Sequence, residues 1–305
     1  MHRISLLLQQ FGQNLVFEKK IVISYEYGQL GNILFRLSNA LAYALEFDYK
    51  VEDYTLAFCN YHDGSSNIQF FENYYTFHFF EYPCPKSRLI NRLKWKFREK
   101  NYRNSKTLEN FKPSFDLTDL PPDSNYKLIG FHFTAKELVN KHRDNICKIL
   151  EFSRMVKDSV DQLIKEVRSQ YPLLLGVHIR AKDFKEFYNG RYYVETSKYL
   201  DLVDQFVNFQ QRDIPVGVII CSDSVEVLQQ IKIEKSRYII HHGSVAQDMQ
   251  LLSMCDYLLG PKASTFSAWA AFIGKIPIFQ IDQHSDLVSE NDFKPVFRLE
   301  PFNLT

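Results

Sequence analysis

Five short apolar runs follow one another through the second half of the chain, and each is continuous rather than alternating. They are Leu173–Ile179, Val216–Ile220, Tyr238–His242, Tyr257–Gly260 and Ile276–Ile281. Between them, apolar residues recur at helical spacing, as at Val225, Leu228 and Ile231. Continuous apolar strands are typical of a parallel sheet that is buried on both faces. The pattern therefore predicts a doubly wound α/β unit, preceded by an amphipathic helix over Phe152–Ser169.

The first half of the chain opens in a similar way. A strand is predicted over Lys20–Tyr25, a turn over the letters EYGQLGN, and a helix over Ile33–Phe47. Lys127–Phe133 is predicted to be the last strand of this half, and the pattern between Cys59 and Lys112 predicts no definite element. The economical interpretation is two α/β lobes, one formed by residues 1–150 and the other by residues 151–305.

Composition narrows the class of protein. Hydrophobic residues make up 45% of the 305, enough for a sizeable core, and a net charge of +1 argues against nucleic-acid binding through overall charge. The five cysteines are scattered without a C-x-x-C pair, which is typical of a reducing compartment. The N-terminal segment is a poor signal peptide and too short for a membrane span, so a cytoplasmic protein is expected.

Three segments carry candidate chemistry, and each follows a predicted strand. The first is YGQLGN, in which Gly28 and Gly31 permit a close approach of backbone to a ligand just before a helix. Amides at a helix start favour an anion. The alternative is a structural turn that holds no ligand.

The second segment is GVHIRAKDF, residues 176–184. It places His178, Arg180 and Asp183 at the carboxyl end of a strand, where ligands bind in open parallel sheets. The guanidinium of Arg180 suits bidentate binding of phosphate. The alternative is a surface ion pair between Arg180 and Asp183, with His178 packed in the strand.

The third segment is GPKASTFSAWAAFIG, residues 260–274. Ser264 or Thr265 can cap a helix that closes at Gly274, and hydroxyls with free amides at a helix start can cradle phosphate. An ordinary capped helix is the alternative. Walker, H-E-x-x-H, cysteine-rich metal and G-x-S-x-G patterns do not occur in the sequence. No metal site is therefore predicted, and a structural role is favoured for His241 and His242.

Together the three segments resemble family 11 glycosyltransferases, the α-1,2-fucosyltransferase type, and the related α-1,6- and protein O-fucosyltransferases. These families carry a G-x-x-G-N loop, an H-x-R-R-G-D-Y stretch and an S-T-F-S-W-W-A-A segment. This chain has GQLGN, HIRAKDF and STFSAWAA in the same order. The likeness covers roughly Ile21–Ala44 and Leu173–Ile281. It departs from the pattern at Ala181, Lys182 and Ala268, where a second arginine, a glycine and an aromatic residue are usual.

The resemblance implies a GT-B fold with two Rossmann-like lobes, the C-terminal one holding the donor GDP-fucose and the N-terminal one facing the acceptor. Arg180 would bind the β-phosphate, and Asp248 would bind the guanine. Asn32 and Gly31 would close over the pyrophosphate from the other lobe. The remaining residues implied to bind the donor are Gly28, His178, Ser264, Thr265 and Ser267.

The implied reaction is transfer of fucose to a glycan hydroxyl with inversion, in an α-1,2 linkage and without a cofactor or metal. Asp183 and Glu186 are alternative general bases, whereas Asp223 is expected to cap the helix that follows it. Two further functions stay open. One is a glycosyltransferase that uses another nucleotide sugar, and the other is a relative that binds nucleotide sugar or glycan without catalysis.

A basic segment is the last candidate feature. Lys86–Lys106 contains nine basic residues and one acidic residue, with Trp95 and Phe97 among them. A solvated face is one interpretation. The other is contact with anionic lipid headgroups or with a lipid-linked acceptor that carries phosphate, which would make the protein peripheral to a membrane.

Overall fold

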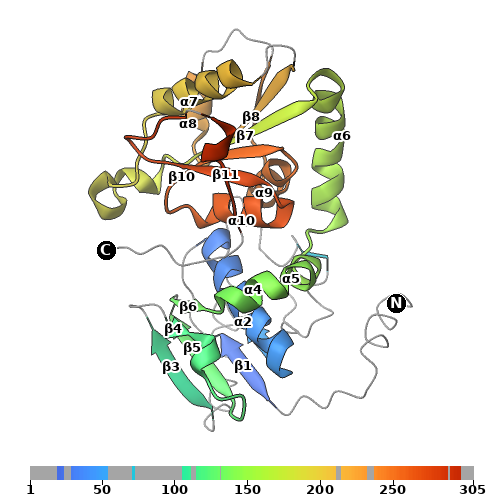
Figure 1. Ribbon diagram of the computed structural model, residues 1–305, viewed down its shortest axis with the longest axis vertical. Coiled ribbons are helices and arrows are strands. Elements are labelled where there is room, and N and C mark those ends of the chain that lie inside the picture. Colours follow the sequence, from blue (N-terminus) through green and yellow to red (C-terminus); the bar gives the residue numbers. More distant parts are fainter. Residues whose placement is uncertain are drawn as a thin grey trace, which may run out of the picture.

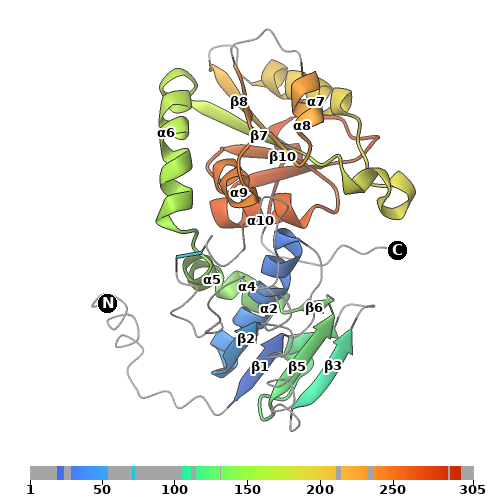
Figure 2. The same ribbon diagram turned by 180° about the vertical axis from the view of Figure 1, so that it is seen from behind.

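The computed structural model describes residues 19–23, 29–53, 71–72, 105–110, 115–130, 132–210, 214–231, 237–287 and 289–296. Two α/β lobes are stacked along the long axis of the molecule (Figure 1), and the view from behind shows the same division (Figure 2). Gly28 and nearly all of the basic segment Lys86–Lys106 lie outside the described residues.

The C-terminal lobe is built on a six-stranded sheet of order β12-β11-β10-β7-β8-β9. Its strands are β7 (Leu173–Ile179), β8 (Val216–Ser222), β9 (Tyr238–His241), β10 (Tyr257–Pro261), β11 (Pro277–Ile281) and β12 (Lys294–Pro295). All neighbours pair in parallel except β11 and β12. The five apolar runs thus become the five parallel strands, as predicted.

Helices cover both faces of this sheet. One face packs against α6 (Arg154–Gln170), α9 (Val245–Ser253) and α10 (Thr265–Gly274), and the other against α7 (Thr196–Phe209) and α8 (Val225–Gln230). Short 3-10 turns η4 (Asp183–Lys185), η5 (Phe187–Gly190) and η6 (Glu290–Asp292) lie in the connections. Alternation along β7 divides its side chains between the two cores, since Leu174 packs on the α9 side and Leu175 on the α7 side. The doubly wound prediction is confirmed.

The N-terminal lobe has a four-stranded parallel sheet of order β2-β1-β5-β3. The strands are β1 (Lys20–Ile23), β2 (Lys50–Asp53), β3 (Lys106–Asn110) and β5 (Tyr126–Gly130), with a small pair β4 (Phe115–Asp116) and β6 (Phe133–Thr134). The helical elements are α2 (Leu30–Phe47), η3 (Leu117–Asp119), α4 (Lys136–Lys141) and α5 (Arg143–Ile149). The strand predicted over Lys127–Phe133 is in fact two, because Gly130 turns the backbone with a φ of 120°.

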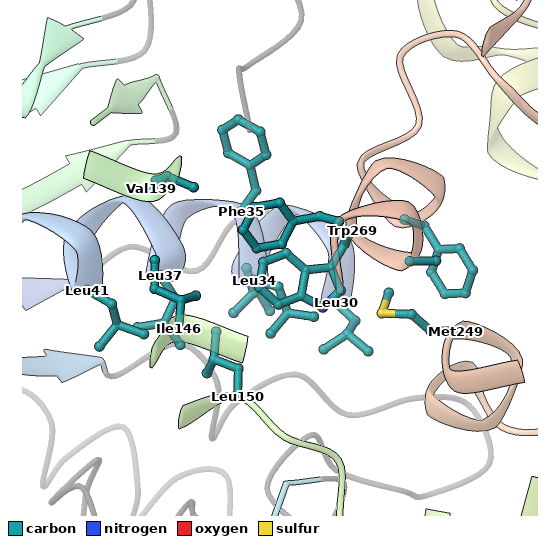
Figure 3. Close-up of a cluster of buried hydrophobic side chains, with 14 of the residues drawn as sticks. Leu30, Leu34, Phe35, Leu37, Leu41, Val139, Ile146, Leu150, Met249 and Trp269 are labelled. Carbon is teal, nitrogen blue, oxygen red and sulfur yellow. The ribbon is translucent and has the colours of Figure 1, made fainter. Parts of the chain in front are cut away.

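One apolar cluster continues from the first lobe into the second. Helix α2 is buried along most of its length and brings Leu30 and Leu34 close to Trp269 of α10 and Met249 of α9 (Figure 3). Trp269 is 1% exposed and stacks on Phe272. Among the residues that the structure describes, none of the helices combines the length and apolar composition needed to span a bilayer.

Candidate functional site

Two helix N-termini from different lobes meet at the junction. Helix α2 begins at Leu30 and α10 begins at Thr265. A Cβ atom on Gly31 would lie 2.7 Å from the backbone nitrogen of Phe266 and 2.8 Å from the hydroxyl of Thr265. Only glycine permits this approach. The first turns, Leu-Gly-Asn-Ile and Thr-Phe-Ser-Ala, contain no acidic residue, so two positive dipole ends face the same region without a neutralising carboxylate of their own.

Side chains join the same two helices. The Thr265 hydroxyl donates to Oδ1 of Asn32 over 2.7 Å. This bond engages the carbonyl oxygen of the Asn32 side chain and so orients its amide group. Asn32 and Thr265, which lie 233 residues apart in the chain, are therefore brought together by the fold.

Arg180 follows β7 directly and lies at this junction. Its Nε donates to Oδ1 of Asp183 over 2.9 Å and its Nη2 donates to Oδ2 over 2.6 Å, while Nη2 also reaches Oε1 of Gln29 at 3.3 Å. The Arg180 side chain is only 13% exposed, whereas that of Asp183 is 50% exposed. The ion pair that the sequence left open is present, and it shows the guanidinium fork in the bidentate geometry that a phosphate also fits.

The loop after β7 is anchored by a residue whose role the sequence did not predict. Oδ1 of Asp223 accepts hydrogen bonds from the amides of Ala181 and Lys182, at 2.8 and 3.3 Å. The expectation that Asp223 caps the following helix is wrong, because Ser224 is the N-cap and its hydroxyl accepts from the amide of Val227. Asp223 instead shapes the turn that presents Arg180, with Oδ2 3.9 Å from Nε of that residue.

His178 lies inside the lobe as a neutral side chain. Burial lowers its pKa to about 3, and the charge of Arg180 contributes in the same direction. Its Nδ1 is 2.7 Å from Oγ of Ser267 and 3.5 Å from Oγ of Ser264, and its ring packs 4.6 Å from that of Phe266. His178 therefore ties the end of β7 to the start of α10.

The hydroxyl groups at the start of α10 have two different roles, one within the helix start and one across the junction of the lobes. Ser264 caps the helix by accepting from the amide of Ser267, as predicted. Ser267 itself is 0% exposed and donates to Ser264. Thr265, by contrast, points across the junction toward Asn32. The structure thus brings Arg180, Asp183, Thr265 and Asn32 together and places Ser267 behind them.

Asp248 lies in the first turn of α9, near the carboxyl ends of β8 and β9. Its Oδ1 accepts from the amide of Gly243 over 3.1 Å and is 2.7 Å from Nδ1 of His241. The residue is 8% exposed. A carboxylate held in this way can accept hydrogen bonds from a ligand on its other oxygen.

Comparison with known proteins gives one family and one fold. The model of glycosyl transferase family 11 matches residues 70–287. Among solved structures, fucosyltransferase NodZ from Bradyrhizobium is 19% identical, with 88% of this chain and 97% of that chain covered and a TM-score of 0.56. A point mutant of Arabidopsis thaliana FUT1 in complex with GDP is 14% identical, with 99% and 79% covered and a TM-score of 0.56.

A further structure agrees with these two. NodZ α-1,6-fucosyltransferase co-crystallised with GDP is 18% identical, with 87% and 96% covered and a TM-score of 0.54. No curated protein gives a significant match. The solved structures confirm the predicted GT-B arrangement of two Rossmann-like lobes.

Proposed function

The chain belongs to glycosyl transferase family 11, and we propose that it transfers fucose from GDP-fucose to a hydroxyl group of a glycan acceptor. One observation carries the proposal. The guanidinium of Arg180 lies where the N-termini of α2 and α10 converge from the two lobes. A cation and two dipole ends at one place form a site for a diphosphate, which is the group that leaves when a nucleotide sugar reacts.

The reaction that suits this site is an inverting displacement. The acceptor oxygen bonds to the anomeric carbon on the face opposite the diphosphate, and the bond to the diphosphate oxygen breaks with its electron pair leaving on GDP. Arg180 and the helix-start amides stabilise the charge that develops on that oxygen, so the proposed step requires no metal. Asn32, whose side-chain amide is oriented by the bond from Thr265, lies at the same junction.

The acceptor hydroxyl loses a proton as its oxygen attacks the anomeric carbon. We assign Asp183 as the carboxylate that accepts this proton. In the structure Asp183 occupies the fork of Arg180. A diphosphate that takes this place releases a half-exposed carboxylate beside the reacting centre. Glu186, in the same loop and exposed, is the alternative base. The α-1,2 linkage follows from the motif resemblance alone and is proposed on that basis.

Activity of an Arg180 variant tests the assignment. GDP-fucose is incubated with a panel of glycan acceptors, and products are detected by mass. We expect Arg180→Ala to lower kcat by about 10²- to 10³-fold, as loss of a preorganised donor to a developing anion does elsewhere. Arg154→Ala, an exposed arginine at the start of α6, is the matched control and keeps its activity. Full turnover by Arg180→Ala would refute the proposal.

The choice of nucleotide is tested by ligand stabilisation. A ligand that binds only the native state adds about 2.7 kcal/mol to the free energy of unfolding at 100 times its Kd. We expect GDP to raise the melting temperature, and UDP and dTDP to leave it unchanged. A preference for UDP or dTDP would favour another nucleotide sugar. Stabilisation by GDP without any transfer or hydrolysis of GDP-fucose would favour the non-catalytic relative.

Location and membrane contact are also proposals. We expect a cytoplasmic protein, and we place the peripheral membrane contact or the lipid-linked acceptor at Lys86–Lys106 because of the basic and aromatic residues there. Co-sedimentation with vesicles tests the contact. Equal binding to anionic and neutral vesicles would eliminate it.

A further inference from the structure

Three potential metal ligands converge at the carboxyl ends of β8 and β9, on the face of the sheet that α9 covers. Cys221 of β8 and His241 of β9 are direct neighbours in the parallel register. Both lie on the α9 face, because Ile219 and Ile239, two residues earlier on the same strands, pack into the core beneath that helix. Asp248 reaches them from the first turn of α9. One ligand atom from each residue lies within 4.8 Å of the other two.

The donor types match one class of ion. A thiolate, an imidazole nitrogen and a carboxylate oxygen are the ligands of Zn²⁺ in proteins, and three protein ligands leave a fourth position open. We propose that Cys221, His241 and Asp248 bind one soft divalent metal ion, with Zn²⁺ as the best match. The sequence favoured a structural role for His241. It could not predict this cluster, because the pairing of β8 with β9 and the crossing of α9 are visible only in three dimensions.

Hydrogen bonds and partial exposure favour metal binding by these three side chains. The amide of Gly243 and Nδ1 of His241 both bond to Oδ1 of Asp248, so neither uses the second carboxylate oxygen. The side chain of His241 is 20% exposed and that of Asp248 is 11% exposed, which gives an ion a route from solvent. Cys221 closes the inner side at 1% exposure.

Metal binding changes protons as well as contacts. Burial holds the pKa of the Cys221 thiol well above its usual range, so the free protein carries the S–H form. When the ion binds, the S–H bond breaks, the S–metal bond forms and one proton leaves to the buffer. His241 binds the ion through a ring nitrogen that carries no proton. The thiolate and the carboxylate together balance the charge of a divalent ion.

Competition with the donor would follow. The motif resemblance implies that Asp248 binds the guanine of GDP-fucose, so under the proposed function a metal bound through the same carboxylate excludes the nucleotide base. This consequence rests on the proposed function, whereas the metal binding itself does not.

The metal site is tested with Cd²⁺, whose bond to a thiolate absorbs in the near ultraviolet. We expect the full-length protein to develop this band with one ion per chain and to lose the band when Zn²⁺ is added in excess. Cys221→Ser should lack the band. Cys147→Ser, which removes a thiol outside the cluster, should keep it. A band of equal size in Cys221→Ser would overturn the proposal.

A second variant is needed because replacing the buried Cys221 could itself impair folding. His241→Gln retains the thiol and alters a partly exposed side chain, and it should weaken Cd²⁺ binding by at least the roughly 10- to 100-fold that changes around metal ligands cause. Unchanged affinity would show that the three residues do not act as one site.

Saturating GDP tests the competition, and it should suppress the absorption band of bound Cd²⁺. If a Cys221-dependent band survives GDP, the metal site stands and the competition is refuted.

Discussion

Arg180 holds an internal carboxylate in the position that a diphosphate would take. The Asp183 contact is bidentate at 2.9 and 2.6 Å, and Gln29 of the other lobe touches the same guanidinium. Because Asp183 is half exposed, its bond to Arg180 is partly screened by solvent, and a more highly charged diphosphate can replace it. Under the proposed function, donor binding therefore releases the carboxylate of Asp183 from Arg180.

His178 makes folding stability depend on pH in a defined window. Its pKa is about 3 in the folded state against 6.5 as the ordinary value. Above pH 6.5 both states are neutral. As the pH falls from 6.5 toward 3, the unfolded chain takes up a proton that the folded chain does not, so the free energy of unfolding falls by about 1.4 kcal/mol per pH unit from this residue.

Denaturant unfolding of His178→Gln tests this dependence. The variant loses the contact of the imidazole with Ser267, so its stability is lower than that of wild type at pH 7. We expect the gap to wild type to narrow as the pH falls from 6.5 to 4.5. His284→Gln, an exposed histidine, should follow the wild-type curve. A gap that stays constant would mean that His178 becomes protonated in the folded protein.

Sequence alone could identify single residues, and it offered Asp183 as a partner of Arg180 within one segment, but it could not predict contacts between segments. The strand ending at Ile179 predicted where Arg180 lies, because ligands gather at the carboxyl ends of parallel strands. The role of Asp223 could not be predicted, since an aspartate before a helix is ordinarily a cap. Only the neighbouring position of β7 and β8 lets it bond to Ala181 and Lys182 instead.

At the scale of elements, the start of α2 differs from the sequence expectation for a physical reason. A helix was predicted from Ile33, after a turn that included Gly31 and Asn32. The helix begins at Leu30, and Gln29 makes no side-chain cap. Glycine near a helix start is usually a sign of a turn. Here Gly31 lies in the first turn because the start of α10 comes within contact distance of it.

The hydrogen bond between Thr265 and Asn32 gives a prediction about these two helix starts. Thr265→Val keeps the shape of the side chain but cannot donate to Asn32. We expect kcat to fall by about 2- to 10-fold, equivalent to one neutral hydrogen bond. The KM for GDP-fucose should change less than kcat, because the Asn32 amide loses its orientation while Arg180 remains in place.

Thr265→Ser is the matched control for this variant, since it retains the hydroxyl group that bonds to Asn32. Steady-state kinetics should show serine close to wild type and valine well below it. If serine and valine behave alike, the hydroxyl has no part in positioning Asn32, and the methyl group of Thr265 is what matters.

At the scale of the whole molecule, the two lobes share a continuous core. The division into two α/β lobes could be predicted because each lobe has its own strand–helix pattern, although the boundary near residue 150 stays a prediction. That the two lobes pack on one another through a shared core could not be predicted. Leu30 and Trp269 each lie at a position typical of an ordinary buried helix residue. Nothing in the spacing of apolar residues shows that α2 packs against α10, as it does in the structure (Figure 3).

The C-terminal end of α10 is held by the N-terminal lobe through Arg143 of α5. Its Nε donates to the carbonyl oxygen of Phe272 over 3.1 Å, its Nη2 donates to the same oxygen, and the guanidinium lies 4.5 Å from the centre of the Phe272 ring. A cation at a helix C-terminus is stabilised by the dipole as well. Helix α10 is therefore attached to the other lobe at both ends, by Thr265 and by Phe272.

Arg143→Met separates these two attachments. Methionine preserves much of the apolar packing but cannot donate to Phe272, so we expect the free energy of unfolding to fall by about 1.5 to 3 kcal/mol, as for a hydrogen bond to a charged group. Asp144→Asn, which removes an exposed pair with Lys275, should leave the free energy of unfolding nearly unchanged. In native buffer kcat should be retained, because the active end of α10 keeps Ser264 and Thr265 in place. A fall in kcat as large as that of Thr265→Val would show instead that the Arg143 contact controls the geometry of the site across the length of the helix.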